Sequence, residues 1–211
     1  LISSKVHDEK YYEDFMGHIR ELYIKKGYVS VFVEKPLVKY DKKNRSVIVT
    51  YRVREGVRAQ VKKINIEGLK DKDKKKVLES MSNKVSGYFN PISFQQDLSV
   101  ILEYLKNEGY YFSEIKNINS GNLVQYRQDN SQVHISLVFE TGLKLFAGDI
   151  IIIGNNKTRK ILIQRELELE EGELITIEKI ENSQVALLSL GIFSSVQILS
   201  LIHISLCRLI G

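Results

Sequence analysis

The stretch YLKNEGYYFSEI, residues 104–115, ends a helix of apolar periodicity and opens the segment that follows it. The chain holds two echoes of it, YIKKGYVSVFVE at 23–34 and LLSLGIFSSVQI at 187–198. Each has a glycine after the last apolar residue of the helix, at Gly27, Gly109 and Gly191, and an aromatic residue one or two positions later. The glycines are 82 residues apart (109 − 27 and 191 − 109). A fixed period in a short chain predicts tandem copies of one folding unit.

A second set of glycines supports the repeat. Gly56 and Gly68 bracket one expected first strand, and Gly142 and Gly154 bracket the next. The spacing is 12 residues in both cases (68 − 56 and 154 − 142). Two landmarks that recur at about the same period indicate a repeated module rather than chance.

One complete module is expected between residues 58 and 142. Its elements, in chain order, are a strand at 58–67, helices at 70–81 and 90–109, and strands at 110–118 and 131–140. The second helix has the apolar stripe Phe94, Leu98, Ile101, Leu102 and Leu105, a capping box at Ser93 and Gln96, and Gly109 as its C-terminal cap. In the last strand Val133, Ile135, Leu137 and Phe139 alternate with other residues, which predicts one buried face.

The flanking regions contain parts of the same module. Residues 1–57 supply a helix at 8–27 and strands at 28–34 and 45–54. Residues 143–198 supply a strand at 145–154, helices at 158–167 and 176–191, and a strand at 192–198. We therefore predict an α+β chain of tandem β-α-α-β-β modules, each a three-stranded mixed sheet with two helices on one face. The expected parts are a first segment (1–57, partial), a middle repeat (58–142, complete) and a third repeat (143–198, truncated).

Composition and motifs give no sign of catalysis. The net charge is +5, and the one cysteine is Cys207. The four histidines are far apart, and no phosphate loop, dinucleotide loop or nucleophile-base set is present. We read the basic run at 70–76 and the acidic run at 165–173 as solvated helix ends. The sequence therefore predicts a non-enzyme without metal or cofactor, while the basic run leaves a nucleic-acid-binding α/β module as an alternative.

The segment after each helix-ending glycine is the expected sheet edge. An open edge has unpaired backbone groups and can accept an extended peptide by strand addition, or it can stay solvated or be covered by the next copy. We hypothesise that these edges bind clients or partners. The candidate residues are Tyr28, Val29, Ser30, Val31, Phe32, Tyr110, Tyr111, Phe112, Ser113, Glu114 and Ile115.

The order and spacing of these motifs resemble the POTRA (polypeptide-transport-associated) repeats of the BamA/TamA superfamily of outer-membrane protein insertases. The resemblance rests on INIEG at 64–68, IIIIGNNKT at 150–158, YLKNEGYYFSEI and the 82-residue period, and it covers residues 7–198. It implies a periplasmic arm tethered to the outer membrane through a β-barrel. The partners implied are unfolded outer-membrane precursors, accessory lipoproteins and the parent barrel. The transporter of a two-partner secretion system is the alternative within this class.

The third repeat looks most like the membrane-proximal POTRA of that superfamily. Arg165 and Glu166 match the Arg-Glu pair of the last repeat, so the resemblance implies a structural role or a position facing the barrel. The resemblance ends at LSLIHIS, residues 199–205, which is similar to a translated sequencing adaptor. We predict that residues 199–211 are a non-native tail.

Overall fold

The computed structural model describes residues 9–41, 43, 46–155 and 157–198. The predicted tail at 199–211 lies outside them. By contacts the chain divides into two units. Unit 1 runs up to Ile101 and includes Ile115–Phe139; unit 2 consists of Leu102–Glu114 and the chain from Glu140 onward.

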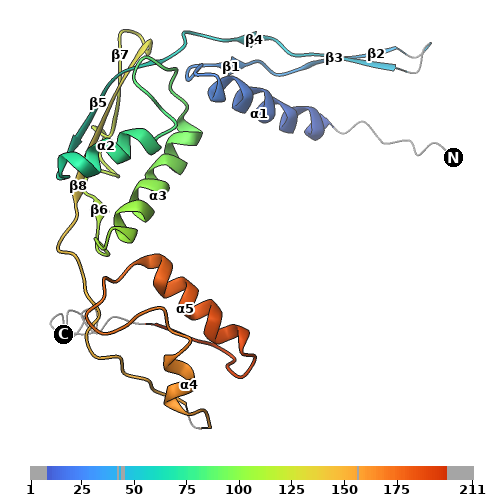
Figure 1. The fold of residues 1–211 in the computed structure, drawn as a ribbon. Coiled ribbons are helices and arrows are strands. Elements are labelled where there is room, and N and C mark those ends of the chain that lie inside the picture. The colour runs from blue at the N-terminus through green and yellow to red at the C-terminus, as the bar shows by residue number, and fades with distance from the viewer. Residues whose placement is uncertain (1–8, 42, 44–45, 156, 199–211) are drawn as a thin grey trace, which may run out of the picture. The chain divides into compact units, whose positions relative to one another are not determined.

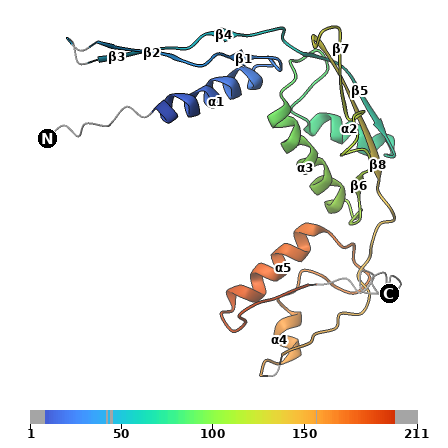
Figure 2. The same ribbon diagram turned by 180° about the vertical axis from the view of Figure 1, so that it is seen from behind.

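The first segment is a helix beside a narrow antiparallel ribbon. Helix α1 (Glu9–Lys25) is followed by β1 (Phe32–Val33), β2 (Leu37–Asp41), β3 (Ser46–Thr50) and β4 (Val53–Arg54). Strand β1 pairs with β4, and β2 pairs with β3. Figures 1 and 2 both show α1 along this ribbon. The Tyr51 hydroxyl donates to the carbonyl of Tyr12 at 3.2 Å, and the rings of Phe15 and Tyr51 are 5.6 Å apart.

The middle repeat has the expected mixed sheet. Its elements are β5 (Gln60–Glu67), α2 (Asp71–Ser80), α3 (Pro91–Asn107), β6 (Glu114–Ile115), β7 (Val124–Arg127) and β8 (Gln132–Glu140). Strand β8 is central: β5 pairs with it in parallel on one side, and β6 and β7 lie on the other, β7 antiparallel (Figure 1). The two short strands β6 and β7 take the place of the one second strand that the sequence predicts.

The hydrophobic core of the middle repeat follows the predicted periodicities. Alternate residues of β8 are buried, as expected for a strand with one face against helices. The fully buried large side chains of this repeat come from its strands, both helices and the loop before α3: Phe89, Phe94, Met81, Ile101, Leu105, Ile135, Leu137, Val61, Val77 and Val133. The predicted face of the last strand therefore lies in the core, and so does the predicted stripe on the second helix apart from Leu102, which is half-buried.

The start of α3 differs from the predicted capping box. Asn90, not Ser93, is the cap: its Oδ1 accepts hydrogen bonds from the backbone N–H groups of Ile92 and Ser93. Pro91 is the first helical residue, where its fixed φ suits the helix and its missing N–H costs nothing. The prediction failed because Asn and Ser are both favourable N-cap residues, and the sequence alone does not show which of the two caps the helix.

The third repeat keeps its second helix but contains no strand among its described residues. Helix α5 (Ile177–Ser189) has Thr176 as its N-cap, and the Thr176 hydroxyl accepts a hydrogen bond from the N–H of Lys179 at 3.2 Å. Helix α4 (Lys160–Gln164) is shorter than the helix predicted at 158–167. The strands predicted at 145–154 and 192–198 are wrong for this structure: the first makes one bridge, between Phe146 and Leu174, and the second makes none.

Candidate functional site

The predicted edge residues are mostly in turns, not in strands. Of the first set only Phe32 lies in a strand, and of the second set only Glu114 and Ile115 do. After Gly27 and after Gly109 the chain folds back on the preceding helix. The N–H of Tyr28 donates to the carbonyl of Tyr23, and the N–H of Tyr110 donates to that of Leu105. These are the long hydrogen bonds of a Schellman C-cap, and they delay the strand by about four residues.

Burial also limits how much of the second set, residues 110–115, is accessible to a peptide. Tyr110, Ser113 and Ile115 are buried, whereas Phe112 and Glu114 are exposed. In the first set Val31 is buried, and the residues 28–31 form a turn closed by the bond from the Val31 N–H to the Tyr28 carbonyl. The expectation of a continuous edge strand directly after the glycine is therefore wrong in both copies.

The second strand of the middle repeat is interrupted by Asn117. This buried side chain takes the place of a strand residue beside β8: Oδ1 accepts from the N–H of Val138 at 3.0 Å, and Nδ2 donates to the carbonyl of Ser136 at 2.8 Å. The turn it anchors separates β6 from β7. An edge broken in this way is a poor template for a long added strand.

The first segment has the more open edge. Strand β2 has β3 as its only strand partner among the described residues. Large apolar side chains along this edge are exposed: Phe32 by 57%, Leu37 by 51% and Tyr40 by 56%. Sequence reasoning missed Leu37 and Tyr40, although the alternation in VKYD, residues 38–41, would have indicated a strand.

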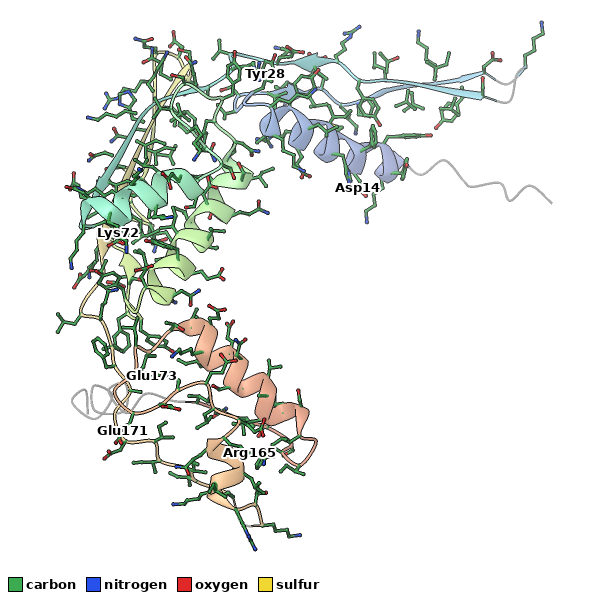
Figure 3. All side chains as sticks on the ribbon, in the orientation of Figure 1. Asp14, Tyr28, Lys72, Arg165, Glu171 and Glu173 are labelled. Carbon is green, nitrogen blue, oxygen red and sulfur yellow. The ribbon has the colours of Figure 1, made fainter. Side chains whose placement is uncertain are left out.

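Arg165 and Glu166 lie where α4 ends. Their side chains form an ion pair, with Arg165 Nε 3.0 Å from Glu166 Oε1, and the arginine is largely exposed (Figure 3). An exposed pair between adjacent residues contributes little to stability, so it can exchange partners at low cost. Arg165 is the more accessible of the two, because Glu166 is part-buried.

Arg165 also lines a hollow of about 570 Å³ in the third repeat. Its apolar lining comes from Ile150, Ile161, Leu167 and Leu169, and its acidic lining from Asp149, Glu170 and Glu171. A hydrogen bond with Asp149 and the repulsion between the two carboxylates raise the pKa of Glu171. Two residues on, a hydrogen bond from Lys179 lowers the pKa of Glu173. Figure 3 shows Glu171 and Glu173 on the segment before α5.

The described residues contain no group of three or more His, Cys, Asp or Glu side chains placed to hold a metal ion. In the same part of the chain no helix is long and apolar enough to cross a membrane.

The middle repeat thus combines two helices with a small mixed sheet, and the third repeat has two helices at the equivalent positions. The POTRA family model, described as a surface antigen variable number repeat, matches residues 59–142 and 147–200. The chain belongs to this family. The predicted resemblance and the α+β fold are thereby confirmed.

Curated relatives are similar to most of this chain. The chain is 28% identical over 174 residues to the outer membrane protein assembly factor BamA of Nitratidesulfovibrio vulgaris, covering 81% of this chain and 21% of the relative. It is 26% identical over 199 residues to BamA of Neisseria meningitidis serogroup B, covering 92% and 24%. The chain thus spans about a fifth to a quarter of these relatives.

A solved structure shows the same fold. The crystal structure of Haemophilus influenzae BamA POTRA3-5 aligns with a TM-score of 0.55 at 19% identity, covering 92% of this chain and 75% of that one.

Proposed function

We propose that this chain is the periplasmic arm of an outer-membrane β-barrel assembly factor, tethered to the membrane by its parent barrel and without catalytic activity. Membership of the POTRA family and the similarity to BamA along most of the chain support this. Its partners in this proposal are unfolded outer-membrane precursors, accessory lipoproteins and the barrel itself.

The observation that carries the binding step is the open edge of β2. An extended precursor segment aligns beside Leu37–Asp41 and gains main-chain hydrogen bonds. The exposed Phe32, Leu37 and Tyr40 side chains add apolar contact. Precursors of β-barrels alternate apolar and polar residues, so the apolar face of such a segment can pack beside Leu37 on one face of β2 or beside Tyr40 on the other. The edge after Gly109 is a secondary site, because Asn117 breaks its second strand.

Photo-crosslinking tests which edge is used. A photoreactive residue is placed at Leu37, in β2, or at Tyr111, in the turn after α3, and the protein is mixed with a labelled peptide of alternating apolar residues. We expect strong crosslinking from position 37 and weak crosslinking from position 111. The reverse pattern would move the site to the middle repeat.

Charge substitution gives a matched control. Leu37→Lys introduces an edge lysine, which natural sheets use to prevent strand addition, and should weaken peptide binding about tenfold. Ile48→Lys places the same charge on the same face of the ribbon but on β3, since Ile48 pairs with Lys39. Equal loss in both variants would contradict binding at the β2 edge. Salt-dependent binding of DNA with no peptide binding at all would favour the nucleic-acid alternative instead.

A further inference from the structure

The helix-ending glycines Gly27 and Gly109 contact a side chain of the following repeat. A Cβ on Gly27 would lie 2.9 Å from Cβ of Tyr88, and one on Gly109 would lie 2.5 Å from Cδ1 of Leu174. Both glycines have positive φ, 93° and 91°. Tyr88 and Leu174 hold equivalent positions before the second helix of their repeats. We call each of these contacts a joint: the first joint lies in unit 1 and the second in unit 2.

Backbone hydrogen bonds repeat the same pattern at both joints. At the first joint the carbonyl of Gly27 accepts from Ala59 at 2.8 Å, and the carbonyl of Ala59 accepts from Phe89 at 2.8 Å. At the second joint Gly109 accepts from Leu145 at 3.1 Å, and Leu145 accepts from Ile175 at 2.9 Å. The period of 82 residues in the glycines therefore marks a repeated docking site for the next module.

A cation stands at the same position of each joint, two residues after Gly56 or Gly142. At the first joint Arg58 lies 5.3 Å from the ring centroid of Tyr28 and 3.3 Å from that of Tyr88. Its Nε also donates to the carbonyl of Lys26, beyond the end of α1, at 2.9 Å. Figure 3 shows Tyr28 where the first segment meets the middle repeat.

The second joint uses a different pair of side chains. Lys144 Nζ lies 4.9 Å from the Tyr110 ring centroid and 3.7 Å from a carboxylate oxygen of Glu108. The position of Tyr88 is taken by Leu174, which has no ring to stack. A planar guanidinium can contact an aromatic ring on each of its two faces, whereas an ammonium is a point charge with one ring here.

We propose that Arg58 is an interdomain clamp that links the end of α1 to the middle repeat through Tyr28 and Tyr88. The clamp holds the open β2 edge and the sheet of the middle repeat in one rigid body. At the second joint Lys144 makes a weaker contact of the same kind, with the one ring of Tyr110.

Spin-label distance measurements on the full chain test the clamp. Labels are attached at Arg20→Cys, on α1, and Lys75→Cys, on α2, with Cys207→Ser in the background; both sites are exposed. We expect Arg58→Ala to broaden the distance distribution at least about twofold. Two ring contacts of ordinary cation–π strength correspond to a rise of about tenfold in the detached population.

Three further variants keep the result interpretable. Tyr88→Leu, which copies the second joint, should broaden the distribution as Arg58→Ala does, while Arg58→Lys should give an intermediate width. Arg54→Ala is the matched control, because Arg54 also lies over a ring, Phe32, and pairs with Glu34, but inside the first segment. An unchanged width in Arg58→Ala and Tyr88→Leu, or equal broadening in Arg54→Ala, would overturn the clamp. No peptide is present, so this outcome is independent of the proposed binding function.

Discussion

The middle and third repeats have the same glycine positions but differ in their sheets. Gly68 and Gly154 both end the expected first strand, with φ of 83° and 88°. Beside Gly68 runs β8, so close that a Cβ would lie 1.9 Å from the carbonyl oxygen of Phe139. Around Gly154 no described atom lies within 4 Å of that position. Among the described residues, the first strand of this module is formed in the middle repeat, where the parallel strand β8 lies beside it, and is not formed in the third repeat.

The β propensities of the two first-strand segments predict the opposite result. The run IIII at 150–153 has higher β propensity than QVKKINIE at 60–67, yet only the latter is a strand. Ile151 is 63% exposed and Ile153 89%. Hydrogen bonds across the sheet, not propensity along the chain, decide this element.

The largest predicted effect breaks the close approach at Gly68. Gly68→Ala should destabilise the middle repeat by more than about 4 kcal/mol, because the new methyl group overlaps a backbone atom that cannot move without parting β5 from β8. Gly154→Ala adds only the strain of positive φ, about 1 kcal/mol. Denaturant unfolding followed by circular dichroism, with amide exchange to assign each transition, compares the two. Equal losses would show that the contact at Phe139 is unimportant.

A second prediction compares Asp97 with Ser183, which hold the equivalent position on the second helix. Buried Asp97 accepts from the N–H groups of Ser82 and Asn83 and from the Asn83 amide. Among the described residues, Ser183 accepts from the N–H of Glu168 alone, at 2.8 Å, and donates to the carbonyl of Lys179.

Asp97→Ala should therefore cost about 3 kcal/mol, since it removes a charged acceptor from the buried N–H of Asn83 and the part-buried N–H of Ser82, and Ser183→Ala about 1 kcal/mol. The same unfolding experiment measures both. Asp97→Asn is the control, because it keeps one acceptor oxygen and the shape of the side chain. A loss in Asp97→Ala no greater than in Ser183→Ala would mean that water satisfies the loop between α2 and α3.

The sequence predicted the elements whose signals are local. Apolar spacing and a glycine cap located α1, α3 and α5, and strict alternation located β8. The edge strands failed for a physical reason: a glycine cap can be followed by a strand or by a turn that folds back to the helix. After Gly109 the chain forms such a turn, and Tyr110 is buried.

Contacts between residues far apart in the sequence could not be predicted from one sequence alone. Asn117 looks like an ordinary turn residue, and only its two bonds to β8 reveal it as a replacement for strand pairing. Arg58 had a weak signal, a basic residue two positions after Gly56 that recurs as Lys144 after Gly142. Its stacking partner Tyr88 lies 30 residues away (88 − 58), and the equivalent position in the third repeat is Leu174, which has no ring. Nothing along the sequence links the two.

The smallest predicted effect concerns two carboxylates of the third repeat with opposite shifts. The pKa of Glu171 is raised by Asp149, so the folded state binds this proton more tightly than the unfolded state does. That contribution is present at acid pH and is lost as the pH rises through the raised pKa. The pKa of Glu173 is lowered by Lys179, so its contribution is present at neutral pH and is lost as the pH falls through the lowered pKa.

Glu171→Gln should therefore raise the unfolding midpoint of the third repeat slightly at pH 7, and Glu173→Gln should lower it slightly. Glu171 is exposed and Glu173 is half-buried, so salt should reduce each difference. Thermal unfolding at pH 7, and again below the ordinary carboxyl pKa of about 4.3, provides the measurement. The gain from Glu171→Gln should vanish at the lower pH, because the wild-type carboxyl is then protonated as well. A midpoint that falls at pH 7 in Glu171→Gln would show that its contact with Asp149 stabilises the third repeat rather than opposing it.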